Sequence, residues 1–222
     1  MSERRKAAMG APQNPAKRFF EWSSAEKCFK YYDKEKQENV MVKLPFKFLY
    51  LDQMITVKGW SESHQSGIWS NEVPTTSKDI LMVKTKKGEI AKGTYKDIKE
   101  KVVAAGARYV QSVYIFMPDG EIANLQLKGS ALAAWSEFTQ KSRRRLPDEW
   151  VTIKTVEDKK KGATKYSQPV FQFDGSITQL DAERADTCFD ILKDHFKEYL
   201  GAPPADPAQA DHDEVEVDDP AW

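Results

Sequence analysis

The stretch that decides the fold is KLPFKFLYLDQMITVKGW, residues 43–60. It is rich in Phe, Tyr, Leu, Ile and Val, which favour strands, and it is long for a strand. Alternation places Leu49, Leu51, Ile55 and Val57 on one face and Phe46, Phe48, Tyr50, Met54, Lys58 and Trp60 on the other. A long strand that is apolar on both faces is typical of the first strand of a small barrel.

Turn chemistry predicts three hairpins after this strand. They pair residues 79–84 with 89–95, residues 108–117 with 121–128, and residues 150–156 with 165–173. The middle turn is Pro118-Asp119-Gly120, in which Pro presets φ and Gly accepts a positive φ. Helical spacing predicts helices over residues 96–105, 130–142 and 179–200, with Thr178 and Asp181 placed to cap the last. Residues 19–39 show no clear period and receive no assignment.

These elements predict a mainly β (α+β) domain. Without an insertion at about residues 61–106, the order β-β-β-α-β-β matches the five-stranded OB barrel. We therefore expect an OB-like domain over residues 19–202, with an inserted hairpin and helix and a C-terminal helix. A flexible basic arm, residues 1–18, and a disordered acidic tail, residues 203–222, flank it.

Charge is segregated along the chain. Residues 206–222 hold seven acids and no Lys or Arg. Without them, 27 acids remain against 34 Lys and Arg, which gives the rest of the chain a net charge of +7. A basic body that carries an acidic segment indicates a nucleic-acid partner.

Several protein classes are not indicated. No apolar run is long enough to span a membrane, and no apolar segment follows the N-terminal basic residues as in a secretory signal. The two cysteines, Cys28 and Cys188, suit a reducing cytoplasm. No zinc spacing, P-loop, dinucleotide fingerprint or hydrolase motif occurs. We therefore expect no enzyme activity, no metal and no cofactor.

Binding of single strands needs cations along the phosphate backbone and flat aromatic faces for the bases. The predicted outward faces and loops supply both. The candidate DNA-binding residues are Lys58, Trp60, Trp69, Lys84, Lys86, Lys87, Tyr114, Phe116, Gln126, Lys128, Lys154, Lys159, Lys160, Lys161, Lys165 and Tyr166. For each aromatic residue, the alternative interpretation is packing in the core. For each lysine cluster, it is a solvated turn without a ligand.

The tail ends in Asp218-Asp219-Pro220-Ala221-Trp222. A basic-rimmed cleft on a partner protein would take the acids and the terminal ring, so these five residues are the candidate partner-binding site.

At this point the chain resembles phage and bacterial single-stranded DNA-binding proteins, which join an OB body to an acidic C-terminus with an aromatic end. The tail tip is similar to theirs, although Trp stands where Phe is usual. Residues 44–73, above all the GW and SGIWSNEV portions, look like phage proteins of this kind that act in replication. The resemblance implies a replication, recombination and repair protein without catalytic activity.

The expected function is thus sequence-independent coating and protection of single-stranded DNA, with partners recruited through the tail. Self-association on the DNA stays open. One alternative is a virion or assembly scaffold that does not bind DNA. Another is a divergent nuclease, which would need an acidic metal site.

Overall fold

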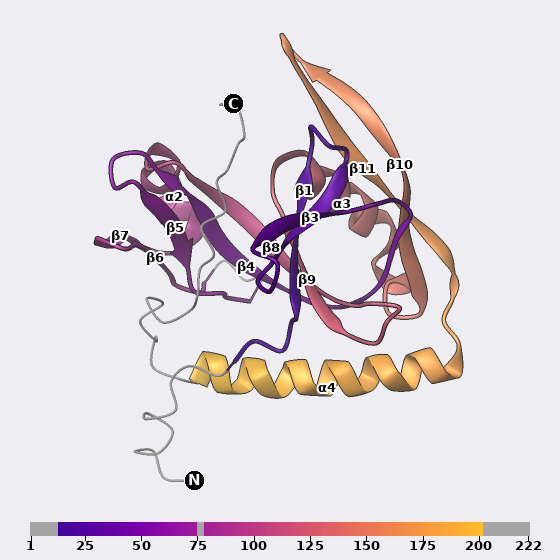
Figure 1. Ribbon diagram of the computed structural model, residues 1–222. Coiled ribbons are helices and arrows are strands. Elements are labelled where there is room, and N and C mark those ends of the chain that lie inside the picture. The colour runs from indigo at the N-terminus through magenta and orange to yellow at the C-terminus, as the bar shows by residue number, and fades with distance from the viewer. Residues whose placement is uncertain (1–12, 75–77, 202–222) are drawn as a thin grey trace. The chain divides into compact units, whose positions relative to one another are not determined.

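The computed structural model describes residues 13–74 and 78–201. This part of the chain is mainly β, with three α-helices and one short 3₁₀ helix (Figure 1). The strands are β1 (Arg18–Ser23), β2 (Cys28–Asp33), β3 (Glu38–Val42), β4 (Phe46–Ser61), β5 (Ser66–Ser70), β6 (Leu81–Thr85), β7 (Gly88–Gly93), β8 (Ala107–Phe116), β9 (Ile122–Leu127), β10 (Glu149–Lys161) and β11 (Thr164–Ser176). The helices are α2 (Tyr95–Ala104), α3 (Gly129–Ser142), η1 (Arg143–Arg145) and α4 (Gln179–Gly201).

The strands form a mixed sheet in the order β3-β2-β1-β9-β8-β4-β5-β6-β7, and the pair β10-β11 joins it through β4. β1 runs parallel to β9, whereas β10 is antiparallel to both β4 and β11. The sheet of the described residues is not closed into a barrel, so the OB-like barrel of five strands is not confirmed. The reason lies in residues 18–42, for which the sequence shows no period, because they form three strands that extend the sheet beyond β9.

The described chain divides into two compact units. Unit 1 holds residues 13–31, 39–52 and 113–201, and unit 2 holds residues 32–38, 53–74 and 78–112. β4 and β8 each supply residues to both units. The insertion expected at about residues 61–106 lies within unit 2.

Unit 1 has an aromatic core. Phe20, Phe29, Phe46 and Phe48 come from three strands and have almost no exposed surface, and Trp135 of α3 is fully buried with them. Neighbouring rings meet at centroid distances of about 5–6 Å, mostly edge-on or tilted, as aromatic pairs prefer. Tyr50 stacks on Trp135 at 6.2 Å, and burial raises the pKa of Tyr50 to about 12.

Helix α4 covers the second face of β8 in unit 1. Phe196 meets the ring of Tyr114 edge-on at 5.1 Å, and Ala185, Leu192 and His195 are buried beside it. Burial lowers the pKa of His195, so the neutral imidazole is favoured there. The predicted cap is confirmed, since Asp181 N–H donates to Thr178 Oγ1 and the Thr178 hydroxyl donates to the Asp181 carboxylate.

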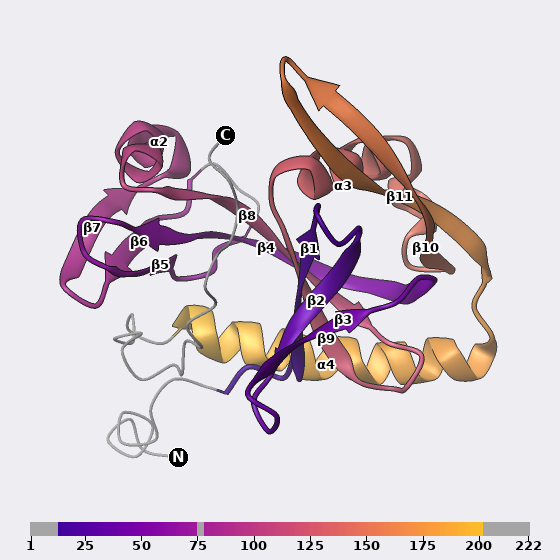
Figure 2. The ribbon, with the colours of Figure 1, turned by 45° about the horizontal axis from the view of Figure 1, so that its top comes forward.

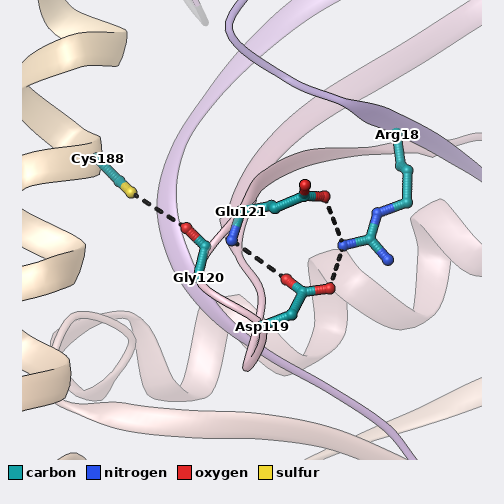
Figure 3. Close-up of polar contacts among 5 residues, drawn as sticks. All are labelled: Arg18, Asp119, Gly120, Glu121 and Cys188. Carbon is teal, nitrogen blue, oxygen red and sulfur yellow. Dashed lines mark hydrogen bonds and ion pairs between the residues drawn. The ribbon is translucent and has the colours of Figure 1, made fainter.

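The predicted β8–β9 turn is confirmed and is tied to its surroundings in unit 1. Arg18 of β1 donates to the carboxylates of Asp119 and Glu121, and Cys188 of α4 lies 3.9 Å from the carbonyl oxygen of Gly120 (Figure 3). Residues 13–18, expected in a flexible arm, belong to this structure, because Ala16 is buried and Arg18 begins β1.

Unit 2 has an aliphatic core. Val57, Ile68, Leu81 and Val83 line one face of β4, β5 and β6, and α2 packs Ile98 and Val102 against them. This face alternates with a second face, which carries the polar and aromatic residues discussed below.

Gly59 marks a close approach of β4 to β8. A Cβ atom there would lie 2.4 Å from both Ala107 Cα and the Gly106 carbonyl oxygen, which are backbone atoms that cannot turn aside. We predict that Gly59→Ala lowers the free energy of unfolding by about 1–3 kcal/mol, as overpacking does, measured by urea denaturation. Gly67→Ala is the matched control, since its Cβ would meet only the Trp69 ring, at 3.9 Å. Equal losses in the two variants would contradict the prediction.

Candidate nucleic-acid interface

The distal end of the β10–β11 hairpin gathers four of the predicted lysines. Lys159, Lys160 and Lys161 end β10, and Lys165 is the second residue of β11. All four are exposed. In both ribbon views this end of the hairpin extends beyond the other elements of unit 1 (Figures 1 and 2). We name these four residues the lysine tip.

The lysine tip stands on strands rather than in a loop. The sequence predicts a loop over residues 157–164, but β10 continues to Lys161 and β11 begins at Thr164. The register sets Lys160 directly opposite Lys165 and Lys159 opposite the half-buried Tyr166. Directly opposite side chains share a face of a hairpin, so the register brings one pair of cations, Lys160 and Lys165, together.

The lysine tip concentrates charge that the protein only partly neutralises. Lys159 lies 3.2 Å from Glu157. Within the described chain, Lys160, Lys161 and Lys165 form no ion pair. Like charges directly opposite each other destabilise a hairpin, and a bound anion would relieve that repulsion. The arrangement therefore suits an anionic ligand.

Unit 2 carries a second group of predicted residues on one sheet face. Lys58 of β4 lies opposite Trp69 of β5, and Trp69 lies opposite Lys84 of β6. The three side chains form a row across three strands. Trp69, expected to contact bases, is only 8% exposed. That prediction is not supported by its burial.

Trp60 differs from Trp69. It follows Lys58 by two residues and so shares its face, and it lies opposite Gly67, which has no side chain. The ring is half-buried, and nothing in the described chain bonds to it or stacks on it. A Cβ at Gly67 would meet only the Trp69 ring, at 3.9 Å, so no other side chain lies within 4 Å of the position that faces Trp60.

Lys86 and Lys87 are exposed in the turn between β6 and β7. His64 fixes this turn to the β4–β5 turn, since its Nδ1 lies 2.9 Å from Thr85 Oγ1. The same Oγ1 accepts the backbone N–H of Lys87 at 3.2 Å. His64 therefore has a structural hydrogen bond within unit 2.

Besides Trp69, three predicted site residues are in the interior, and the structure corrects them. Tyr114 is fully buried against α4, and its hydroxyl accepts a hydrogen bond from the Asn14 amide at 2.9 Å. Phe116 is 2% exposed and packs near Trp150, while Gln126 is 5% exposed on β9, whose six residues are all buried. The alternation along β8 and β9 predicts one exposed face, but residues 112–116 of β8 and all of β9 are buried on both faces.

Two other predicted lysines are already engaged with acids. Lys128 lies 3.3 Å from Glu21. Lys154 pairs with Asp174, which also lies 3.2 Å from Lys47. Hydrogen bonds from Lys154 and Lys47 hold the pKa of Asp174 below its ordinary value. These lysines are less available to a phosphate than the lysine tip.

Sequence reasoning missed Ser24 and Lys27, which belong to the turn between β1 and β2. Lys27 Nζ lies 2.7 Å from the carboxylate of Asp158, next to the lysine tip. Lys27 and Asp158 are 131 positions apart in the sequence, so no local pattern could pair them.

The described residues contain no group of three or more His, Cys, Asp or Glu placed to hold a metal ion. Cys28 and Cys188 are free thiols, and burial raises the pKa of each. None of the helices that the structure describes is long and apolar enough to cross a membrane. The expectation of no enzyme activity stays a prediction.

No protein-family model, curated protein or solved structure matches the chain. The similarity to single-stranded DNA-binding proteins rests on the residues quoted above. The predicted partner-binding residues Asp218, Asp219, Pro220, Ala221 and Trp222 lie outside the described residues.

The exposure of Trp60 gives a test by collisional quenching. In a Trp222→Phe background, which removes the tail indole from the signal, iodide should quench Trp60 more than Trp69 because the Trp60 ring is less buried and Lys58 lies on the same face of the sheet. We predict that Trp60→Phe removes more of the iodide-quenchable emission than Trp69→Phe. Equal losses would show that Trp60 is as protected as Trp69.

Proposed function

We propose that this protein binds single-stranded DNA without sequence preference and protects it during replication, recombination or repair, without catalysing a reaction. The observation that carries the proposal is the lysine tip, in which four exposed cations stand together and Lys160 faces Lys165. A free protein gains nothing from this repulsion, whereas a phosphate backbone neutralises it. Phosphate binding also releases condensed counterions, which favours association at low salt.

Trp60 would supply the contact with bases. An accessible indole beside Gly67, with Lys58 on the same face, can take the flat face of any base, because every base has a π-face. Lys58, Lys84, Lys86 and Lys87 would contact phosphates near it. An OB-type barrel is not required, because a hairpin and an open sheet face offer the same two kinds of contact.

We further propose that the acidic segment over residues 206–222 recruits replication or recombination proteins, with Trp222 as its anchor. A cytoplasmic location and self-association on DNA belong to the same proposal.

The alternative is a virion or assembly scaffold. Exposed apolar side chains on α4 favour it, since Leu180, Ile191 and Leu200 are about half exposed, at 55%, 50% and 49%. A labelled oligo-dT separates the two functions. The proposed function predicts binding that weakens steeply with salt and exceeds binding to a duplex of equal length, whereas no binding at low salt favours the scaffold.

Lys160→Glu tests the lysine tip because it should move stability and binding in opposite directions. The new carboxylate would face Lys165, so we predict a gain of about 0.5 kcal/mol in the free energy of unfolding. Affinity for oligo-dT should fall, and the slope of log K against log salt should shrink by about 0.7 for each phosphate that the variant no longer neutralises. Fluorescence anisotropy across a salt series and urea denaturation measure the two effects.

The matched control for this variant is Lys99→Glu on α2, an exposed lysine outside the candidate site. It changes the net charge equally. If both variants weaken binding to the same extent, general charge rather than the lysine tip governs affinity.

Trp60→Ala tests the base contact separately. We predict that the wild type binds oligo-dT more tightly than an abasic oligonucleotide of equal length. The variant should lose about 5- to 150-fold on oligo-dT, the equivalent of one stacked base, and almost nothing on the abasic strand. Gly67→Leu should act in the same direction by filling the space beside the ring. An equal loss on both strands would instead indicate damage to unit 2.

A further inference from the structure

Besides the pairing of β10 with β4, the β10–β11 hairpin is anchored to the rest of unit 1 nearer its distal end, where Ser167 faces Asp158. Ser167 is 1% exposed. Its N–H donates to Ser24 Oγ at 2.7 Å, and its own hydroxyl donates to the Ser24 carbonyl oxygen at 2.7 Å. Two short hydrogen bonds, both donated by Ser167 and accepted by Ser24, thus join the hairpin to the β1–β2 turn.

The carbonyl oxygen of Ser167 strengthens this anchor. It accepts hydrogen bonds from Trp22 Nε1 at 3.2 Å and from Ser130 Oγ at 2.9 Å. Trp22 lies on β1, and Ser130 lies in the first turn of α3. Three separate elements of unit 1 therefore hold the same residue of β11.

The β1–β2 turn also holds β10, the other strand of the hairpin. Asp158, which faces Ser167, pairs with Lys27 at 2.7 Å. Lys27 has a φ of 55°, in the left-handed region where glycine is favoured. A lysine there carries backbone strain that glycine would avoid, and its ammonium group reaches the hairpin.

All four lysines of the lysine tip lie on the far side of this anchor. The positions beyond it pair Lys159 with Tyr166, Lys160 with Lys165 and Lys161 with Thr164. The anchor therefore decides where the lysine tip stands relative to the rest of unit 1, although none of its residues belongs to the tip.

We propose that Ser24 and Lys27 of the β1–β2 turn are positioning residues, which hold the hairpin so that the lysine tip binds phosphates with little loss of conformational freedom. The inference rests on the proposed function. A fixed hairpin needs no ordering when the DNA binds, and this saving is the general advantage of preorganisation. Ser24 and Lys27 act through the hairpin and make no phosphate contact themselves.

Ser24→Ala in the full-length chain tests the proposal with Ser23→Ala as matched control. Ser23 is the adjacent residue at the end of β1, but its hydroxyl only accepts the N–H of Glu26. We expect Ser24→Ala to weaken oligo-dT binding about 3- to 10-fold while the salt slope stays unchanged, because the same phosphates are neutralised. Amide hydrogen exchange in residues 159–166 should speed up without DNA. Ser23→Ala should alter neither readout.

Lys160→Gln should give the opposite pair of results to Ser24→Ala. It should reduce the slope of log K against log salt by about 0.7 and leave hydrogen exchange in the hairpin unchanged. Lys27→Gly separates positioning from stability, because it relieves the left-handed strain while removing the pair with Asp158. We expect Lys27→Gly to keep the thermal stability of the wild type, to bind oligo-dT more weakly and to leave the slope of log K against log salt unchanged. A slope that shrinks in Lys27→Gly would make Lys27 a phosphate contact and would overturn its positioning role.

The two proposals fail in different ways. If the wild type does not bind oligo-dT, the proposed function fails, while hydrogen exchange still reports whether Ser24 holds the hairpin. If the wild type binds but Ser24→Ala matches Ser23→Ala in affinity and in exchange, the positioning inference is overturned and the proposed function stands.

Discussion

The parallel pairing of β1 with β9 is the constraint on which unit 1 depends. It aligns Arg18–Glu21 with Ala123–Gln126, across about one hundred residues of sequence. Because side chains alternate along a strand, a slip of one residue would turn Phe20 out of the aromatic core. The same register carries the β1–β2 turn to the hairpin, where Ser24 meets Ser167. Core packing and the position of the lysine tip therefore follow from one strand pairing.

Local chemistry predicted much of the fold. The hairpin turn at Pro118-Asp119-Gly120, the cap at Thr178 and the helices α2, α3 and α4 are each specified by residues close together in the chain. The strands β1, β2 and β3 were not predicted, because their aromatic and charged residues follow no clear period. β1 pairs with β9, a long-range contact that leaves no local pattern, and β2 and β3 follow it in the sheet.

Candidate site residues were predicted correctly as exposed where the exposure of the side chain depends on neighbours in the sequence. They were predicted wrongly where it depends on packing against distant parts of the chain. A lysine at the end of a hairpin is exposed whatever the remaining fold, so the lysine tip was found. Tyr114 has an alternating position that favours exposure, but α4 covers it from about eighty residues further along the chain. Trp60 and Trp69 lie in one stretch of sequence, and only the register, with Gly67 beside one and two lysines beside the other, distinguishes them.

The lysine tip and its anchor have opposite electrostatic characters. At the anchor, Ser167 satisfies its polar groups inside unit 1, and Asp158 neutralises Lys27. Beyond it, Lys160 and Lys165 face each other, and neither forms an ion pair within the part of the chain that the structure describes. The anchor holds the backbone of β10 and β11 beside these two lysines, and an anion bound between them would relieve their repulsion. In the proposed function, a hairpin without the anchor would have to be ordered when that anion binds, so the anchor and the lysine tip act together.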